Sequence, residues 1–466
     1  MTKALAYIGV VGLISLIAAF SGFTTDQVLA IAVFVGFIAG TLFYWPFRLA
    51  FAFAGISILL GAHLLDIPHL IEFASLDVIL FLIGMMTVIG YLEERHFFEW
   101  VLEKLLPSIG GTARKLMGSL MVLAFLSAAL VDEVTSILFM SAIVLRVARH
   151  YKLNPVPYII MTVFATNIGS SATVVGNPIG VLIALRAGLT FPDFLRWATP
   201  IAIAALLLTM VLAFIYFRRP LEEMESKMRQ ARQALKGKGG ETLAGAATTE
   251  AGNMLFPSLL FLGTVAGLIL HKQIEHALGL GTNTMLVGVA LFAAALVLFI
   301  ERDRARELVE KRVDWWTLAF FMLLFASAGT LRFMGVTDVI ARGMINVTGG
   351  QTTPLLLVIT WSIGALTAFM DNVLAVASFI PIVGDLAKEG VQTAPLWWGM
   401  LFGGTILGNL TLIGSTANIV VLGLLERQEK RHVSFMEWFW PGLVTAVPSL
   451  ALATLLLWLQ LPLLTK

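Results

Sequence analysis

The sequence predicts an all-α polytopic membrane protein. Of its 466 residues, 58% are hydrophobic and only 13% are charged, and the mean hydropathy is +0.90. A soluble domain carries about 25% charged residues. Apolar runs of about 17 to 20 residues recur along the whole chain, and each can cross a bilayer as one helix. An outer-membrane barrel would show shorter, alternating segments instead.

The composition also excludes several functions. The net charge is only +2, and no basic patch of the kind that binds nucleic acid is present in the sequence. The seven His are scattered, and the absence of Cys excludes disulfide bonds, iron–sulfur clusters and thiolate metal sites. We therefore expect no resident metal cluster or cofactor and no nucleic-acid partner. We also expect that the protein is not an enzyme. H+ or Na+ is expected only as a coupling or transported ion.

The apolar runs form two halves, residues 1–217 and 254–466. We predict full spans at residues 4–20, 27–43, 46–62, 76–92, 198–217, 255–271, 284–300, 315–334 and 436–462. No small-residue cleavage site follows the first run, so we expect it to be retained as a span. The acidic residues Asp77 and Asp314, which open two spans, are expected N-caps, and Glu93 is expected to be solvated. Arg186 and Arg332 are expected at the membrane interface.

The two halves are joined by a polar linker at residues 218–253. It carries seven Lys or Arg and five Glu, and its end is rich in Gly, Ala and Thr. This composition predicts a helix followed by a flexible segment. The positive-inside rule places the linker in the cytoplasm. We expect the chain to lie in the cell (inner) membrane.

The run at residues 116–147 predicts a re-entrant hairpin. As one helix it would be about 48 Å long, which is too long for a hydrocarbon core of about 30 Å, and it is too short for two full spans. Two half-spans that meet at Asp132 and Glu133 fit this length. Basic residues flank both ends of the run, so both ends are predicted to be cytoplasmic.

A second hairpin is predicted at residues 353–386, with Asp371 and Asn372 at its tip. Only Lys388 provides a basic residue near its ends, so we place these ends outside the cell. The two halves are then inverted repeats that meet at one site. An ionisable side chain at bilayer depth is costly and by default marks an ion or substrate pathway.

Each hairpin is followed by a broken helix, at residues 157–185 and 397–425. Polar residues, Gly and Pro interrupt these runs, and irregular backbone at membrane depth is tolerated only where it is buried or lines a cavity. Asn167 follows Asp132 by 35 residues, and Asn409 follows Asp371 by 38 residues. The candidate binding residues of both halves are Asp132, Glu133, Thr135, Asn167, Ser170, Ser171, Thr173, Asn177, Thr367, Asp371, Asn372, Asn409, Ser415, Thr416 and Asn418.

These residues also have structural interpretations. Asp132 and Asp371 can cap the half-helices that follow them. Asn167 and Asn409 can form interhelical hydrogen bonds, and the Ser and Thr residues can serve as small packing residues. In the functional interpretation, the carboxylates of Asp132, Glu133 and Asp371 exchange a proton or coordinate Na+.

The motifs resemble those of the ion transporter superfamily, which includes arsenite permeases, the P protein of melanosomes, D-type sodium/proton antiporters and divalent-anion/sodium symporters. The first tip, Asp132-Glu133-Val134-Thr135, resembles the Asp-Asn-Val-Thr tip of the arsenite permease and P-protein branch. Residues 166–180 resemble its Thr-Asn-Ile-Gly-Gly run. The second tip, Thr367 to Asn372, is similar to the Ser/Thr-x-x-x-Asp-Asn pattern of the antiporters. Glu133 stands where the first branch has Asn, and Asn177 stands where it has Asp.

This resemblance implies a scaffold domain that forms a homodimer and a transport domain that moves like an elevator. It implies a secondary active transporter for a small inorganic solute, such as arsenite or an oxyanion, coupled to H+ or Na+. The alternative is a Na+/H+ antiporter that uses Asp132 and Asp371. A dicarboxylate/sodium symporter is disfavoured because the Ser-Asn-Thr tips are absent, and the sequence context of Asp371 does not fit an intramembrane aspartyl protease.

Overall fold

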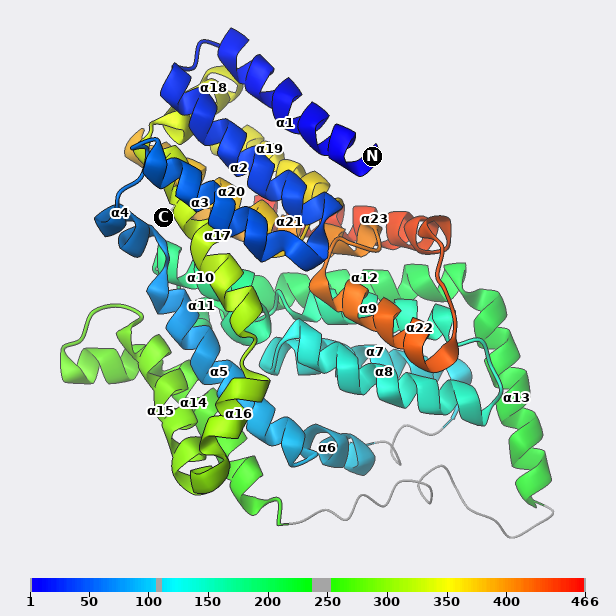
Figure 1. The fold of residues 1–466 in the computed structure, drawn as a ribbon. Coiled ribbons are helices and arrows are strands. Elements are labelled where there is room, and N and C mark those ends of the chain that lie inside the picture. The colour runs from blue at the N-terminus through cyan, green and yellow to red at the C-terminus, as the bar shows by residue number, and fades with distance from the viewer. Residues whose placement is uncertain (1, 106–110, 237–252, 465–466) are drawn as a thin grey trace.

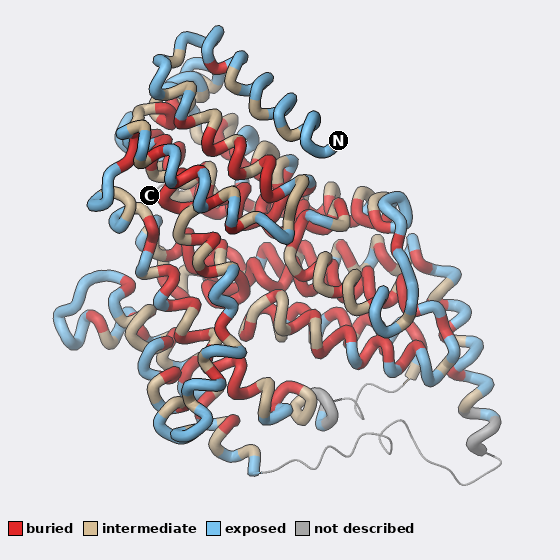
Figure 2. Tube along the Cα trace, in the orientation of Figure 1, coloured by how far each residue is buried: buried red, intermediate tan, exposed pale blue. Residues whose placement is uncertain are grey.

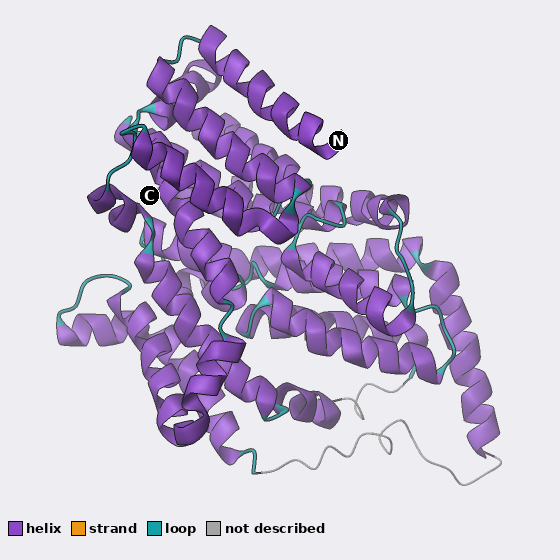
Figure 3. Ribbon diagram, viewed as in Figure 1, coloured by secondary structure: helices purple, strands orange, loops and turns teal. Residues whose placement is uncertain are grey.

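The computed structural model describes residues 2–105, 111–236 and 253–464 (Figure 1). Within this part of the chain every regular element is a helix, as Figure 3 shows. Nine helices of the described residues are long and apolar enough to cross a membrane. The predicted all-α polytopic class is therefore confirmed.

One group of helices packs around α5 and α17, and we refer to it as the scaffold. α15 packs against α5 and α14, while α17 packs against α2, α3 and α4. α1 (Thr2–Phe20) contacts α2 at the edge of the molecule and leaves most of its surface exposed (Figure 2). The other scaffold helices are α2 (Thr25–Phe43), α3 (Arg48–Gly61), α4 (Ile67–Phe73), α5 (Leu76–Glu94), α14 (Leu255–Leu278), α15 (Thr284–Glu301), α16 (Ala305–Arg312) and α17 (Trp315–Phe333).

The remaining long helices form a more buried central bundle (Figure 2). α7 packs against α9, α19 packs against α21, and α12 packs against α23. The bundle contains α7 (Ala113–Leu130), α8 (Glu133–His150), α9 (Val156–Gly169), α10 (Pro178–Ala187), α12 (Thr199–Tyr216), α19 (Thr352–Thr367), α20 (Asn372–Lys388), α21 (Ala394–Ile406), α22 (Thr416–Glu429) and α23 (Phe435–Leu464).

Both predicted hairpins are present, and an Asp marks each tip. Asp132 has an extended backbone and caps α8, since its Oδ1 accepts the N–H groups of Val134 at 2.8 Å and Thr135 at 2.9 Å. Asp371 caps α20 in the same way, because its Oδ1 accepts the N–H of Val373 at 3.0 Å. The cap starts a new helix where the preceding one ends, so the apolar run folds back on itself.

The two hairpins extend in opposite directions from their tips. The far end of α7 meets α13 (Arg218–Lys236), where Glu225 accepts the N–H of Ala113 at 2.6 Å. The far end of α20 meets α18 (Val336–Thr348), where Thr337 donates to Asp385 at 2.6 Å. Because α13 and α18 lie at opposite ends of the molecule in Figure 1, the two hairpins are inverted relative to each other.

A repeated hydrogen bond fixes each broken helix to its own hairpin. The hydroxyl of Thr173 donates to the carbonyl of Ala129, and the hydroxyl of Thr411 donates to the carbonyl of Ala368. The carbonyls are 239 residues apart (129 to 368) and the hydroxyls 238 apart (173 to 411). The nearly equal offsets support two related halves.

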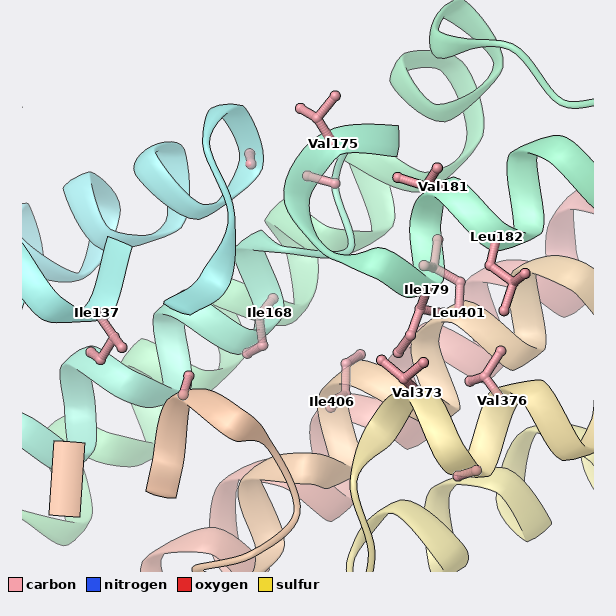
Figure 4. Packing of buried hydrophobic residues seen from close by; sticks show 14 of the residues in the cluster. Ile137, Ile168, Val175, Ile179, Val181, Leu182, Val373, Val376, Leu401 and Ile406 are labelled. Carbon is pink, nitrogen blue, oxygen red and sulfur yellow. The ribbon is translucent and has the colours of Figure 1, made fainter. Parts of the chain in front are cut away.

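Each of the two broken helices is interrupted within its predicted run. α9 ends at Gly169, a 3-10 turn (η3, Val174–Gly176) follows, and Asn177 caps α10 by accepting the N–H of Gly180 at 2.7 Å. In the second half α21 is followed by a 3-10 turn (η7, Leu407–Leu410), and Ser415 caps α22. Figure 4 shows apolar side chains of both halves packed together, with Ile179 of α10 beside Val373 of α20 and Leu401 of α21.

Gly169 is required where α9 crosses α7. A Cβ atom at this position would lie 2.3 Å from the carbonyl oxygen of Phe125, which is backbone and cannot rotate away. We expect Gly169→Ala to lower the free energy of unfolding by about 1–3 kcal/mol through overpacking. Thermal unfolding of purified protein measures this loss. Gly12→Ala is the matched control, because a Cβ there meets nothing within 4 Å, and equal melting temperatures for the two variants would contradict the expectation.

Some elements differ from the sequence expectations. The span predicted at residues 46–62 is a 3-10 turn (η1, Trp45–Phe47) followed by the 14-residue α3, which is short for a full crossing. α4, α16 and α18 were not expected, because short or amphipathic helices lack a long apolar run. α13 confirms the helical start of the linker, and residues 237–252 lie outside the described residues. The other short elements are α6 (Phe97–Leu105), α11 (Phe191–Asp193), the π-helical turn η4 (Phe194–Ala198) and η6 (Arg302–Arg304).

Candidate ion and solute site

The two hairpin tips meet at Glu133 and Asn372. The amide of Asn372 donates to Oε1 of Glu133 at 3.2 Å, and these two residues are 239 positions apart. This is the offset that relates the two halves, so equivalent positions of the two tips are in direct contact. Glu133 is only 3% exposed and Asn372 only 1% exposed.

Glu133 is surrounded by neutral hydrogen-bond donors. Ser170, from the first broken helix, donates to Oε2 at 3.1 Å, and Ser415, from the second, donates to Oε1 at 3.4 Å. Glu133 forms no ion pair with any Lys, Arg or His of the described residues. An ionised carboxylate buried without a cation is costly. The arrangement therefore suits a group that takes up a proton or accompanies a cation.

The two Asp residues combine capping with a position at a cavity wall. In Asp371, Oδ1 caps α20 and Oδ2 accepts the hydroxyl hydrogen of Thr416 at 2.8 Å. In Asp132, Oδ1 alone receives both capping bonds. Both Asp residues are therefore helix caps, as the structural interpretation predicts. Both also line the cavity described next.

A cavity of about 290 Å³ lies between the tips and the scaffold. Seven of the candidate binding residues line it from the bundle side: Asp132, Glu133, Thr135, Asn177, Asp371, Asn372 and Thr416. α3, α5 and α17 form the opposite wall, with side chains that include Arg48, Met85 and Phe320. The site therefore lies at the boundary between the two groups of helices.

Four other candidate residues form a hydrogen-bond network that does not line this cavity. The amide of Asn167 donates to Oδ1 of Asn409 at 2.7 Å and to Oδ1 of Asn418 at 2.9 Å, and Ser415 donates to Oδ1 of Asn167 at 3.1 Å. Asn167 and Asn409 are 242 residues apart, three more than the tips, so they are partners and not equivalent positions. The network joins the two broken helices.

The remaining candidate residues lie within the bundle. Ser170 links the Glu133 carboxylate to Asn177, whose amide donates to the Ser170 hydroxyl at 2.8 Å. Ser171 donates to the carbonyl of Ile168 at 2.6 Å, and Thr173 bonds to backbone as described above. Thr367 is fully buried, and its hydroxyl has no hydrogen-bond partner among the described residues. The structure thus places Ser171, Thr173 and Thr367 as packing or backbone-binding residues.

The expectations for the scaffold acids were partly wrong. Asp314 caps α17 as expected, accepting the N–H of Thr317 at 3.0 Å. Asp77 is not a cap, since Ser75 precedes α5; it pairs instead with Arg186 of α10 at 2.8 and 3.0 Å. Glu93 is half-buried at the cavity, where Arg312 donates to it at 3.0 Å.

One further ion pair lies between the scaffold and the bundle, away from the cavity. Arg332 of α17 pairs with Asp385 of α20 at 3.2 Å, so a second ion pair joins scaffold and bundle. Sequence reasoning missed these partners because they come from distant segments.

Within the described ranges, His, Asp and Glu side chains form no group of three or more that could hold a metal ion. A bound Na+ would therefore need amide, hydroxyl or backbone oxygens beside a carboxylate.

Removing the Asn167 side chain should loosen the junction of the broken helices. Asn167→Ala leaves the buried amide oxygens of Asn409 and Asn418 without this donor, so we expect a loss of about 1–3 kcal/mol in the free energy of unfolding. Asn346→Ala, at an exposed position of α18, is the matched control. Thermal unfolding compares the two, and a network that contributes nothing would give the same small shift in both.

Comparisons with known proteins find similarity to membrane transporters. The chain matches the sequence model described as "Citrate transporter" (CitMHS) at residues 38–403 and 334–465. It is 32% identical to "Uncharacterized transporter Rv2684" of Mycobacterium tuberculosis over 391 residues, which are 82% of this chain and 86% of that protein. It is 23% identical to the human P protein over 448 residues, covering 82% of this chain and 53% of the P protein.

A solved structure shares the fold. The crystal structure of the Alcanivorax borkumensis YdaH transporter, described as having an unusual topology, superposes with a TM-score of 0.57. The sequence identity is 18%, and the match covers 89% of this chain and 90% of that one. At this identity the likeness concerns the fold alone.

Proposed function

This chain belongs to the citrate transporter family of membrane transporters, and we propose that it is a cation-coupled secondary transporter. The family membership confirms the predicted resemblance to the ion transporter superfamily. Glu133 is the group that carries the coupling cation, with Asp132 and Asp371 beside it at the cavity wall. The single observation that supports this assignment is a buried carboxylate shared by both tips and bonded only to neutral donors.

H+ is the coupling ion that fits this carboxylate best. Its three partners are an amide N–H and two hydroxyls, and an amide N–H cannot coordinate Na+. A proton needs only the carboxylate itself and a hydroxyl to accept the new O–H. Na+ remains the alternative coupling ion, at oxygens of the tips that are free of capping bonds.

The solute is a small molecule that carries no net negative charge when bound. The bundle wall presents three carboxylates against one arginine without an ion pair among the described residues, Arg48, because Arg312 is already paired with Glu93 and Glu94. Like charges close together in a cavity of low dielectric repel strongly. Arsenite fits as its neutral hydroxide. Citrate, which the family description names, would fit with its charges neutralised by protons or by a bound cation.

We infer that the cavity opens toward the face that carries the linker. α14 begins directly after the linker and α15 returns to the same face, where Arg304 and Arg312 bind Glu94 at the end of α5. Glu93, next to these pairs, lines the cavity. With the linker in the cytoplasm, as the positive-inside rule predicts, this is the inward-facing state of an elevator-type carrier. A homodimer formed through the scaffold is part of the same proposal.

Uptake into proteoliposomes tests the function. The panel contains arsenite, phosphate, sulfate and citrate with and without Mg2+, under imposed H+ or Na+ gradients, with a trapped pH dye. We expect one solute to accumulate when the proton gradient is inward, with proton entry that requires this solute. Failure of every solute to move protons would contradict a solute/proton transporter.

A Na+/H+ antiporter is the second candidate, favoured by the excess of carboxylates at the cavity. The same proteoliposomes separate the two functions, because an antiporter moves protons in response to a Na+ gradient with no other solute present. If Na+ alone moves protons and Asp371→Asn abolishes this flux, the antiporter replaces the first proposal. Arg342→Gln, on an exposed residue of α18, is the control.

A further inference from the structure

Arg48 is an arginine of the cavity wall that has no ion pair among the described residues. The cavity is lined by two arginines, Arg48 on α3 and Arg312 at the end of α16. Arg312 is engaged by Glu93 and Glu94, each at 3.0 Å. Arg48 is half-buried and donates instead to a neutral hydroxyl, that of Thr317, at 2.8 Å. A half-buried guanidinium without an ionised partner is costly, so a charged counterpart for part of the time would stabilise it.

The scaffold holds the Arg48 side chain in one position. The guanidinium carbon lies 4.2 Å from the ring centroid of Trp45, in the turn before α3, and 5.4 Å from that of Phe320 on α17. Thr317 accepts from Arg48 and donates to Oδ2 of Asp314 at 2.6 Å. Stacking and a relayed hydrogen bond therefore orient the charge before any ligand arrives.

The charge lies at the cavity that the second hairpin tip also lines. Arg48 and Asp371 line this cavity from opposite walls, and Arg48 is joined to Asp314 through the hydroxyl of Thr317. Asp314 is occupied as the cap of α17, whereas Asp371 belongs to the bundle and lies across the cavity. Arg48 is on the scaffold, so its distance from Asp371 depends on where the bundle stands. The other charged groups that line the cavity are Asp132 and Glu133 on the bundle side and Arg48, Asp314, Glu93 and Arg312 on the scaffold side.

We propose that Arg48 is a position-dependent counter-charge for Asp371. When the bundle occupies the position seen here and has released its cation, the fixed guanidinium balances the ionised Asp371 carboxylate. This favours cation release on the linker side. When the bundle moves away, Asp371 loses this partner, so the negative charge of the tips favours retention of the cation that Glu133 carries. The inference rests on the proposed cation-coupled function and adds the scaffold residue that makes release favourable on one side.

A double-mutant cycle on purified protein in Na+-free buffer tests this coupling. We expect Arg48→Gln to lower the melting temperature by about 2 °C or more, Arg48→Lys to recover most of the loss, and Arg48→Gln to have little further effect in an Asp371→Asn background. Lowering the pH from about 8 to about 4 should shrink the Arg48→Gln effect, because protonated carboxylates need no counter-charge. Arg196→Gln is the control and should show none of this dependence, because Arg196 is exposed, lies over the Trp197 ring and has no ion pair among the described residues.

The cycle is independent of the transport assay, because it needs no solute. Equal effects of Arg48→Gln with and without the Asp371 carboxylate would overturn the proposal, and so would a loss that Arg48→Lys does not recover. A further arm, Asp314→Asn, separates the neighbouring acid: if this substitution, and not Asp371→Asn, removes the effect of Arg48→Gln, then Arg48 serves α17 alone. A failed solute screen leaves these outcomes unchanged.

Discussion

Glu133→Gln should abolish proton-driven accumulation of solute. Gln is close to Glu in shape and keeps one oxygen that can accept from Asn372 and Ser415, but it cannot bind the coupling proton, so solute transport loses its link to the proton gradient. With one proton per solute, a gradient of about two pH units supports about 100-fold accumulation. We expect the variant to lose this accumulation and its proton entry, while exchange of solute against solute continues.

Two controls keep this result interpretable. Glu72→Gln changes an exposed glutamate of α4 and should leave accumulation intact. Thermal unfolding should show that Glu133→Gln is folded, since a neutral amide at this place relieves the cost of a buried charge. Accumulation that survives in Glu133→Gln and still follows the proton gradient would remove Glu133 from the coupling mechanism.

Locking the bundle to the scaffold should stop transport. The Asp77–Arg186 ion pair joins α5 to α10 at the boundary that an elevator movement must break. The chain has no Cys, so Asp77→Cys with Arg186→Cys gives a protein in which a bifunctional thiol reagent can bridge only this pair. We expect bridging to reduce uptake by about 10-fold or more, limited by labelling yield, and reduction to restore it, because a bridged boundary cannot slide.

The chain offers a matched pair within the bundle. Arg149 of α8 and Glu429 of α22 form an ion pair at 2.6 Å, and both belong to helices that would move together. Bridging Cys residues at these two positions should leave uptake nearly unchanged. If this internal bridge stops transport and the boundary bridge does not, the division into scaffold and moving bundle is wrong.

Length and charge along the sequence were enough to predict the hairpins. The run at residues 116–147 fits neither one span nor two, and Asp132 interrupts it where a new cap is needed. The same logic located the second tip at Asp371. The broken helices followed from their polar residues, Gly and Pro, because such a segment cannot remain one regular helix at membrane depth.

Pairing between distant segments could not be predicted in the same way. The contact of Glu133 with Asn372 crosses 239 residues, and only the meeting of the tips reveals it. The two Asn residues seemed equivalent by spacing, but they differ by about one helical turn and bind each other. Arg48 carried no signal, since one arginine beside an apolar run is typical of a membrane interface. Its importance depends on which helices face the tips.

The most direct test of a carboxylate shared by both tips is to move it from one tip to the other. Glu133→Asn removes the coupling group, and Asn372→Glu adds one at the equivalent position, which lies against the first. Proton-driven uptake into proteoliposomes is the measurement. We predict that Glu133→Asn alone is inactive and that the double variant regains a clear part of the activity. If the double variant is folded and as inactive as Glu133→Asn, or if Glu133→Asn alone still accumulates solute, then the tips do not share one coupling site.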